Sequence, residues 1–322
     1  MRAAHITELS GPDAVSVVEV PAPTVVPGQI LIDVHAAGVN FPDLLMTRGE
    51  YQVKPDLPFI PGSEVAGVVA AAPAGSGFSV GDRVTSFTML NGLAEQVAVS
   101  PELAMRIPDS MTLAEGASLP MNYLTMEFAL IRRAALQPGE TVLIHGAAGG
   151  IGTAGIQISK ALGATVVAVA SSESKREVAL SAGADHAIDV DGFLGAAKEL
   201  TGGRGVDVVV DPVGGERFTD SLRCLAPEGR LLVIGFTAGD IPTVRVNRLL
   251  LNNIDVRGVG WGAFAFMRPG FISQQWASIS RLIETGTIHP PIGAEFPLEQ
   301  VDDAIAELGA RRAIGKVVVT VR

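Results

Sequence analysis

The sequence is poor in residues on which several classes of protein depend. It contains one cysteine, Cys224, so no intramolecular disulfide bond can form and a zinc site built from four cysteines is excluded. Lys and Arg number 24 against 34 Asp and Glu, which gives a net charge of −10. This shortage of basic residues argues against a protein whose main role is to bind nucleic acid, because phosphate binding needs basic surface.

Long apolar runs are also missing. The N-terminal residues MRAAHITELSGPDAV lack the apolar run of a secretion signal. No stretch of about 18 uninterrupted apolar residues, the length that spans a membrane, occurs anywhere in the chain. Hydrophobic residues still make up 48% of the chain, which is ordinary for a globular enzyme and argues against disorder. The length of 322 residues exceeds the usual size of one compact core. We therefore expect a soluble protein of two domains in a reducing compartment, the cytoplasm.

Residues 1–120 are predicted to be mainly β-structure. Short β-branched runs such as VSVVEV, ILIDVHAAGV and DRVTSF are separated by stretches rich in Gly and Pro. Prolines crowd the stretch from Pro23 to Pro61, which argues against long helices there. The tail, residues 262–322, returns to a mixed character and is too small to stand alone. We expect it to complete the N-terminal domain.

Residues 121–261 alternate between apolar runs and amphipathic segments. Strands are expected over TVLIHG (141–146), ATVVAVA (164–170), HAIDV (186–190), VDVVVDPVGG (206–215), GRLLVIGF (229–236) and NIDVRGVG (253–260). Near-continuous apolar strands separated by helices indicate a parallel sheet covered on both faces. The predicted fold class is therefore α/β, with a doubly wound Rossmann sheet in residues 121–261 and a mainly-β domain built from 1–120 and 262–322.

The segment HGAAGGIGTAG contains five glycines directly after the first of these strands. The pattern G-x-G-x-x-G can be read from Gly150 to Gly155, or three residues earlier with Ala147 in the first position. A dinucleotide-binding fold needs its glycines at the strand-to-helix turn, where backbone N–H groups and the helix dipole meet the pyrophosphate. The earlier register lies at that turn. The residues predicted to bind a dinucleotide are Ala148, Gly149, Gly150, Ile151 and Gly152.

The end of the second strand indicates which dinucleotide is preferred. The position that holds an acid for the ribose 2′-hydroxyl in many such folds is Ala170, followed by Ser171 and Ser172. Without a carboxylate to repel it, a 2′-phosphate can bind both serines and Lys175, which favours NADPH over NADH. An alternative stays open, in which Lys175 is a solvated charge and Glu173 reaches the ribose.

Motifs spread over the whole chain resemble one family. They are AGVNFPDLLMTRGEY (37–51), PGSEVAGVV (61–69), GFSVGDRV (77–84), LPMNYLT (119–125), GAAGGIG (146–152), DPVGG (211–215), VIGF (233–236) and GKVVV (315–319). In these motifs the sequence resembles the zinc-free quinone oxidoreductases related to zeta-crystallin, in the medium-chain dehydrogenase/reductase superfamily. The resemblance implies a GroES-like catalytic domain made from both chain ends, with the Rossmann domain between them.

The resemblance also implies roles for single residues in the substrate cleft. Asn40 would hold the nicotinamide end of the cofactor, and Tyr51 would hydrogen-bond an acceptor oxygen at the cleft mouth. The residues themselves allow other interpretations, since Asn40 can cap a turn before Phe41 and Tyr51 can be a packing residue. The chain departs from some relatives at Leu45, where they carry a second cleft tyrosine.

Further cofactor contacts follow from the same resemblance. Thr125 would contact the nicotinamide from the domain junction, and Gly235 and Phe236 would shape the ribose–nicotinamide wall. Lys316 is similar to a basic residue near the cofactor tail. Val190 stands where some relatives carry a tyrosine near the adenosine phosphate.

A metal site is not expected. Zinc alcohol dehydrogenases of the same superfamily carry a cysteine ligand near positions 37–43 and Gly-His-Glu where this chain has Gly62-Ser63-Glu64. Catalytic zinc needs three protein ligands, and only Glu64 of this set is present. Reduction of a simple ketone needs an electrophile for the growing oxyanion charge, whereas a quinone or conjugated enone spreads that charge by itself.

These features together predict an NADPH-dependent, metal-free oxidoreductase that transfers a hydride to a quinone. Two alternatives remain: a reductase of 2-alkenals or enoyl thioesters on the same fold, and a cofactor- or RNA-binding protein without activity. The expected partners are a small-molecule quinone or conjugated carbonyl, with no nucleic acid and no membrane. We also expect a homodimer, because the apolar segment NIDVRGVG would otherwise be an unprotected sheet edge.

Overall fold

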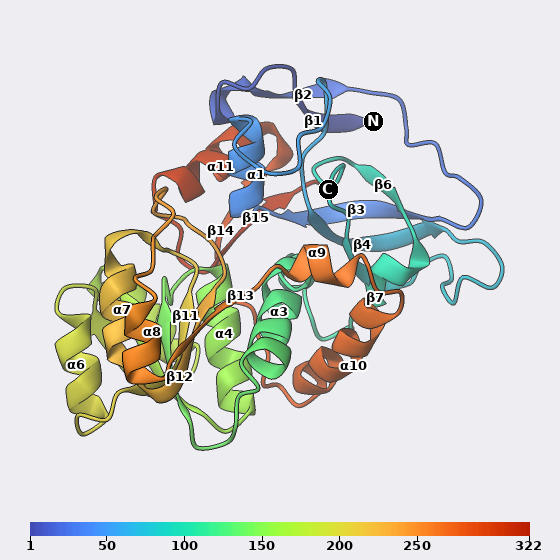
Figure 1. Cartoon of the computed structure of the whole chain (residues 1–322). Coiled ribbons are helices and arrows are strands. Elements are labelled where there is room, and N and C mark those ends of the chain that lie inside the picture. Colours follow the sequence, from blue (N-terminus) through green and yellow to red (C-terminus); the bar gives the residue numbers. More distant parts are fainter. The chain divides into compact units, whose positions relative to one another are not determined.

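The computed structural model describes residues 1–322 (Figure 1). Their internal contacts form two compact units. The first unit comprises residues 1–121, 269–280 and 289–322, and the second comprises residues 122–268 and 281–288. Both ends of the chain therefore belong to the first unit, and the middle of the chain forms nearly all of the second. No helix in either unit combines the length and apolar character needed to cross a membrane.

The second unit is built on a six-stranded parallel sheet. Its strands are β8 (Thr141–His145), β9 (Thr165–Ala170), β10 (His186–Asp189), β11 (Val206–Asp211), β12 (Leu225–Val233) and β13 (Asp255–Gly258). They are arranged in the order β10-β9-β8-β11-β12-β13, and every neighbouring pair is parallel. This order reverses direction at β8, as in a doubly wound dinucleotide fold, and confirms the predicted Rossmann sheet.

Helices cover both faces of this sheet. They are α4 (Gly150–Ala161), α5 (Glu173–Ser181), α6 (Phe193–Leu200), α7 (Phe218–Cys224) and α8 (Asn247–Asn252), and a short helix, α9 (Trp261–Ala265), follows β13. In Figure 1 the ribbons of α6 and α7 lie on one side of the strands and α4 on the other, and α6 contacts α7. Because both faces are covered, the strands are apolar along their whole length, which is the pattern that the sequence shows.

Three segments of this part of the chain are less regular. The helix α3 (Pro120–Glu127) continues into a π-helical turn, η3 (Phe128–Arg133), whose end bonds Ala134 N–H to the carbonyl of Ala129. Strand β12 begins at Leu225, directly after α7, four residues before the predicted start at Gly229. The register between β11 and β12 shifts between Val206 and Val208, which accommodates this early start. Helix α10 (Phe271–Glu284) has residues in both units.

The first unit is a mainly antiparallel β-structure. Its strands are β1 (Arg2–Ile6), β2 (Val15–Glu19), β3 (Ile30–Gly38), β4 (Glu64–Ala71), β5 (Arg83–Phe87), β6 (Gln96–Val99), β7 (Ala104–Arg106), β14 (Ile292–Pro297) and β15 (Lys316–Thr320). The main sheet has the order β14-β15-β3-β4-β5-β7, with β6 paired to β3. The C-terminal strand β15 pairs with β3 from the N-terminal region, so the tail completes this sheet.

Three helices accompany these strands: α1 (Phe41–Thr47), α2 (Leu113–Gly116) and α11 (Val301–Gly309). They are short, which agrees with the proline-rich sequence. Helix α1 begins directly after β3, and Pro42 occupies its first turn, where a missing N–H costs no hydrogen bond. Side chains of α1, α11 and the strands form one buried cluster that includes Val34, Leu44 and Ile305.

The core of the second unit holds two groups with uncommon chemistry. Cys224, the only cysteine, is fully buried at the end of α7, and burial raises the pKa of its thiol to about 11. His145 is fully buried at the end of β8, where its Nε2 lies 2.8 Å from the Ser221 hydroxyl and its Nδ1 has no partner. Burial lowers the pKa of His145 to about 3, so its ring is neutral in the folded protein.

Candidate functional site

The glycine loop of the second unit lies between β8 and α4. Strand β8 ends at His145, the helix begins at Gly150, and Gly149 is the N-cap residue. The turn needs a left-handed residue at Gly146, whose φ is 60°. The earlier register of the glycine pattern therefore lies on the strand-to-helix turn, whereas the later one, from Gly150 to Gly155, lies wholly inside α4.

Two glycines of this loop have a steric reason and a third does not. A Cβ atom at Gly152 would lie 2.4 Å from the carbonyl oxygen of Gly146, so the helix can approach the strand only with glycine here. At Gly150 a Cβ would meet the side chain of Asn122 at 2.6 Å. At Gly149, by contrast, the nearest atom would be 3.5 Å away, so the space beside that residue is open.

This arrangement fits a dinucleotide. The first N–H groups of an α-helix have no partner inside the helix. Two of them here belong to Gly150 and Gly152, which carry no side chain that could block a ligand. The positive end of the helix dipole adds to the attraction for a pyrophosphate. The open space beside Gly149 lets a phosphate approach the backbone closely, so the residues present fit the group that the sequence predicts.

The carboxyl ends of the neighbouring strands meet at the same edge of the sheet. After β11, the Asp211 carboxylate accepts the N–H groups of Val213 (2.9 Å) and Gly214 (2.8 Å) and so holds the turn of the DPVGG motif. Phe236 follows β12, and its ring lies so close to Gly214 that a Cβ there would be 3.1 Å away. Gly235 and Phe236 thus lie beside this turn.

The predicted adenosine-end residues follow β9, and one of them has a structural task. The Ser172 hydroxyl caps α5 by accepting the Lys175 N–H at 3.3 Å, and it also lies 3.1 Å from the Ser174 hydroxyl. Ser171 is exposed. Because serine is both a common N-cap and a phosphate ligand, the sequence alone cannot separate the two tasks at Ser172. The phosphate contacts of all three residues stay predictions.

Sequence reasoning missed Arg176, the next residue of α5. Its Nη1 lies 3.4 Å from the carbonyl oxygen of Ala170 and forms an ion pair with Asp189 at the end of β10. The signal was available: an arginine in the first turns of the helix, and an acid at the end of the neighbouring strand. Ala170 and Asp189 are paired in the sheet register, so the two strand ends are adjacent.

The first unit contains a buried polar cluster formed by Asn40, Ser63, Glu64 and Lys316. The Asn40 amide nitrogen lies 2.8 Å from Glu64 Oε1 and 3.2 Å from the Ser63 hydroxyl. The Lys316 ammonium donates to Asn40 Oδ1 at 2.6 Å and to Glu64 Oε1 at 2.5 Å. Glu64 is 0% exposed and Lys316 4%, so this is an ion pair removed from water.

Backbone elements hold this cluster in place. Asn40 follows β3 as the N-cap residue of α1, Glu64 begins β4, and Lys316 begins β15, which pairs with β3. The remaining carboxylate oxygen of Glu64 accepts the N–H of Met121 at 2.8 Å. The structure therefore brings together Asn40 and Lys316, which are 276 residues apart in the sequence.

The contacts of Asn40 combine both interpretations of this residue. It does cap α1 by position, and the Asp43 carboxylate accepts its backbone N–H at 2.8 Å. Its side chain is turned away from the helix toward Glu64 and Lys316, which use its amide nitrogen and oxygen. Its predicted contact with the nicotinamide stays a prediction, as does the contact of Lys316 with the cofactor.

Asp43 is a second residue that sequence reasoning missed, although the spacing Asn40-x-x-Asp43 is that of a capping box. The carboxylate is fully buried and also accepts the N–H of Gly62 at 3.1 Å. Burial raises the pKa of Asp43 to about 6, although both N–H bonds and the charge of Lys316 act against this rise. Burial, with a smaller contribution from the Asp43 charge, also raises the pKa of Tyr51, which packs against the same core.

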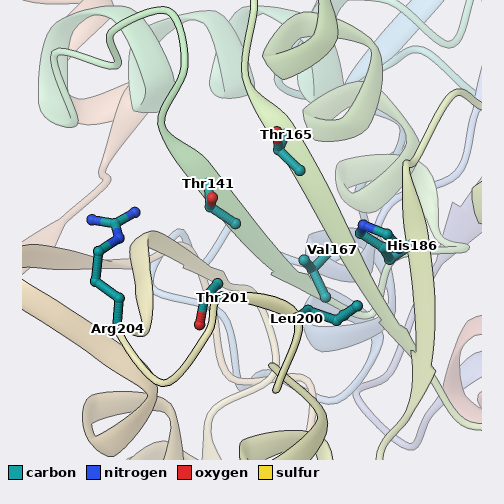
Figure 2. A pocket seen from close by; sticks show the side chains of 7 residues that line it. All are labelled: Thr141, Thr165, Val167, His186, Leu200, Thr201 and Arg204. Atoms are coloured by element: carbon teal, nitrogen blue, oxygen red, sulfur yellow. The ribbon is translucent and has the colours of Figure 1, made fainter. Parts of the chain in front are cut away.

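Two further places bear on where chemistry can occur. Thr125 is buried on α3, and its contact with the nicotinamide stays a prediction. A depression of about 290 Å³ lies at the opposite, amino-terminal edge of the parallel sheet (Figure 2). Thr141, Thr165 and His186, the first residues of three strands, line it together with Arg204. None of the residues predicted to bind a cofactor lies there.

Two family models match different parts of the chain. Residues 26–109 match the family model "Alcohol dehydrogenase GroES-like domain", and residues 150–284 match "Zinc-binding dehydrogenase". A rat (Rattus norvegicus) protein, "Quinone oxidoreductase-like protein 2", is 40% identical over 325 residues, covering 100% of this chain and 92% of its own length. The chain belongs to the quinone oxidoreductases of the medium-chain dehydrogenase/reductase superfamily.

Two solved structures share this fold along their whole length. A mycobacterial protein crystallised with NADPH has a TM-score of 0.92 and 34% identity, and each chain is covered completely. The Escherichia coli quinone oxidoreductase, also complexed with NADPH, has a TM-score of 0.90 and 26% identity, again with complete coverage. The predicted family and fold class, a GroES-like domain with a Rossmann sheet, are thus confirmed.

Although one matching model is named for zinc binding, the buried cluster lacks the donors for it. Nowhere in residues 1–322 do three His, Cys, Asp or Glu side chains gather into a potential metal site. Ser63, which the resemblance places where zinc relatives carry a ligand histidine, accepts a hydrogen bond from the Asn40 amide nitrogen. The ammonium of Lys316 adds a buried positive charge within the same cluster, which opposes binding of a second cation.

Proposed function

We propose that this oxidoreductase uses NADPH to reduce a quinone by hydride transfer without a metal ion. Three observations support this proposal: the glycine loop fits a dinucleotide, two similar structures contain NADPH, and full-length relatives carry quinone oxidoreductase names. When bound, the nicotinamide supplies the hydride. The chain's own residues bind and orient both partners.

The cluster of Asn40, Ser63, Glu64 and Lys316 carries the choice of substrate. Where zinc relatives carry metal ligands, this chain has an amide, a hydroxyl and an ammonium that are bonded to one another or to Glu64. These groups do not form a Lewis acid for a developing alkoxide. A quinone needs none, because its ring delocalises the added charge, so the site suits an electron-poor acceptor.

Binding roles follow from the position of each residue. The backbone at Ala148, Gly149, Gly150, Ile151 and Gly152 would hold the pyrophosphate, and Ser171, Ser172 and Lys175 the adenosine end. Thr125, Gly235 and Phe236 would form the pocket for the nicotinamide and its ribose. In the first unit Asn40, fixed by Lys316 and Glu64, would present one wall of the acceptor site.

Tyr51 would donate a hydrogen bond to the acceptor oxygen. Its hydroxyl has no hydrogen-bond partner within residues 1–322 and the ring is half-buried in the core of the first unit. Burial and the charge of Asp43 both raise the pKa of Tyr51, so the hydroxyl keeps its proton at neutral pH. A protonated phenol can donate a hydrogen bond to the quinone oxygen and so stabilise the negative charge that remains on it.

The test is oxidation of NADPH by the metal-stripped protein against three substrate groups: quinones, short 2-alkenals and enoyl thioesters. We expect turnover with quinones that is unchanged by chelators, and a lower kcat for Tyr51→Phe with an unaltered dissociation constant for NADPH. Turnover with enoyl thioesters alone would contradict the quinone assignment. Tight cofactor binding without turnover of any substrate would favour a binding protein, and stoichiometric zinc in chelator-free protein would overturn the metal-free mechanism.

We further infer that two copies pair through β13. This strand is at the edge of the six-stranded sheet, where it pairs with β12 on one side only. An unpaired edge binds a second strand readily, and two-fold pairing would extend the sheet across the dimer. We expect a dimer by light scattering at micromolar concentration, with slow hydrogen exchange at the β13 amides that do not face β12. A monomer with rapidly exchanging β13 amides would contradict this arrangement.

A further inference from the structure

Arg176 lies at the place where a Rossmann fold meets the adenosine ribose. It is the fourth residue of α5, and its side chain reaches back to the carboxyl end of β9, where Nη1 is 3.4 Å from the carbonyl oxygen of Ala170. The same nitrogen forms the ion pair with Asp189. Ala170 is the strand-end position that holds an acid in many NAD-binding proteins.

The hydrogen bonds of this ion pair leave N–H groups of the guanidinium without a partner and engage each carboxylate oxygen once. Asp189 uses Oδ1 to accept the N–H of Asp191 at 3.0 Å and Oδ2 for Arg176. These bonds lower the pKa of Asp189, so its carboxylate is ionised and committed to the turn and to the arginine. On Arg176 only Nη1 is engaged, so Nε and Nη2 keep three N–H groups without a partner inside the protein.

We propose that Arg176 is the residue that selects NADPH over NADH, by binding the 2′-phosphate through its Nε and Nη2 groups while Asp189 positions the guanidinium. This inference rests on the proposed function. A guanidinium presents two parallel N–H donors that match a phosphate, whereas the lysine at position 175 supplies a point charge. The side chain is 26% exposed, so the phosphate can reach it, and the site is drier than open surface.

An NADH site is the competing arrangement and needs a carboxylate oxygen for the ribose hydroxyl. Asp189 is the nearest candidate, since it is paired in register with Ala170. Each of its oxygens already accepts one hydrogen bond and its charge is balanced by Arg176, so it is a weaker acceptor for a ribose hydroxyl than an unpaired carboxylate. At this edge the ribose would meet the free N–H groups of Arg176. These donors bind a charged phosphate more strongly than a neutral hydroxyl.

The experiment is calorimetric binding of 2′,5′-ADP and 5′-AMP, two probes that differ only in the 2′-phosphate. We expect the wild type to bind 2′,5′-ADP more tightly. Arg176→Gln should weaken that binding roughly ten- to hundredfold, as expected for charged hydrogen bonds, with 5′-AMP unchanged. Arg176→Lys should lose less, roughly three- to tenfold, because it keeps the charge and loses the paired geometry.

Arg204→Gln is the matched control. Arg204 also pairs with an aspartate, Asp207, but it lines the depression at the amino-terminal edge of the sheet, which Thr165 at the start of β9 also lines (Figure 2). The length of β9 separates the two edges by roughly 15–20 Å. That is more than the Debye length of about 8 Å at physiological salt, so this charge loss should leave both dissociation constants within about twofold.

Each outcome decides between the assignments. If Arg176→Gln weakens 2′,5′-ADP no more than Arg204→Gln does, or weakens 5′-AMP equally, Arg176 is not the selecting residue. If Asp189→Asn weakens 5′-AMP, then Asp189 binds the ribose and the proposal is wrong, whereas unchanged 5′-AMP binding supports a purely positioning role. Equal binding of the two probes by the wild type would also overturn it, while leaving an NADH-dependent oxidoreductase intact. Failure to bind either probe would overturn the proposed function itself.

Discussion

The two units hold their functional groups in different ways. In the first unit, side chains from three separate places in the sequence bond to one another inside the protein, as Asn40, Ser63, Glu64 and Lys316 do. In the second, the backbone supplies the binding groups. The glycine loop between β8 and α4 exposes N–H groups and has no room for a side chain at Gly152. The first arrangement depends on charge balance and the second on volume, so different substitutions should break each.

The largest effect is expected from removing the buried ammonium. Lys316→Met leaves the Glu64 carboxylate buried without its cation, which should lower the free energy of unfolding by about 3–5 kcal/mol. Urea unfolding followed by circular dichroism measures this loss. The double variant Lys316→Met/Glu64→Gln should recover much of it, because no unpaired charge remains.

The exposed pair Arg223–Asp220 provides the control. Because both side chains are solvated, Arg223→Gln should change the free energy of unfolding by no more than about 0.5 kcal/mol. If Lys316→Met costs no more than this surface change, the cluster of the first unit is not held together by charge balance.

The next effect concerns pH and the buried imidazole of the second unit. His145 has a folded pKa of about 3, below its usual value of 6.5, so the unfolded chain binds a proton that the folded chain does not. Its contribution to stability is therefore complete above pH 6.5 and is lost as pH falls toward 3, at about 1.4 kcal/mol per pH unit. Unfolding measured from pH 7 to 4.5 should show a shallower loss in His145→Gln than in the wild type.

Comparison with the variant is necessary because Asp43 in the first unit titrates with the opposite sign. Its folded pKa of about 6 is raised above 3.8, so its contribution is complete below pH 3.8 and is lost as pH rises through 6. The difference between wild type and His145→Gln cancels this contribution. An identical pH profile for both proteins would show that the imidazole is not kept neutral in the core.

The smallest effect on stability separates fold from binding within the glycine loop. Gly152→Ala places a Cβ 2.4 Å from a backbone oxygen and should cost about 1–3 kcal/mol, because α4 must move away from β8. Gly149→Ala meets nothing closer than 3.5 Å and has a φ of −85°, so stability should change by less than about 0.5 kcal/mol.

Binding should reverse part of that ranking. The Gly149 methyl group would occupy the open space where a phosphate approaches, so Gly149→Ala should weaken NADPH binding at least about tenfold in fluorescence titration. If Gly149→Ala binds NADPH as well as the wild type does, the pyrophosphate does not lie against this loop.

The same contrast explains what could be predicted from the sequence. The glycine loop and the six parallel strands are local patterns, since spacing and alternation are visible within a few tens of residues, and they were predicted correctly. The cluster of the first unit depends on β15 pairing with β3, which brings Lys316 to Asn40 across 276 residues. No pattern in the sequence encodes that contact.

Two errors of detail have physical causes. The N-terminal part of β12 lies four residues earlier than predicted, because α7 ends at Cys224 and the strand follows without a loop. Arg176 was overlooked because only Ser171, Ser172, Glu173 and Lys175 were considered after the strand, whereas the Arg176 side chain extends back toward the end of that strand. Long side chains near a helix N-terminus can reach backwards in this way, which a residue-by-residue reading of the strand end does not consider.

The lone thiol of Cys224 makes the second unit observable by itself. With no exposed surface and a pKa of about 11, it is neither accessible nor ionised while the sheet and α7 are packed. A thiol reagent can therefore modify it only when this core opens. Because the chain has no other cysteine, the labelling rate reports how often the second unit opens, without any contribution from the first unit. A dinucleotide that binds the glycine loop should lower the labelling rate of Cys224 in proportion to its occupancy, so this one side chain reports cofactor binding.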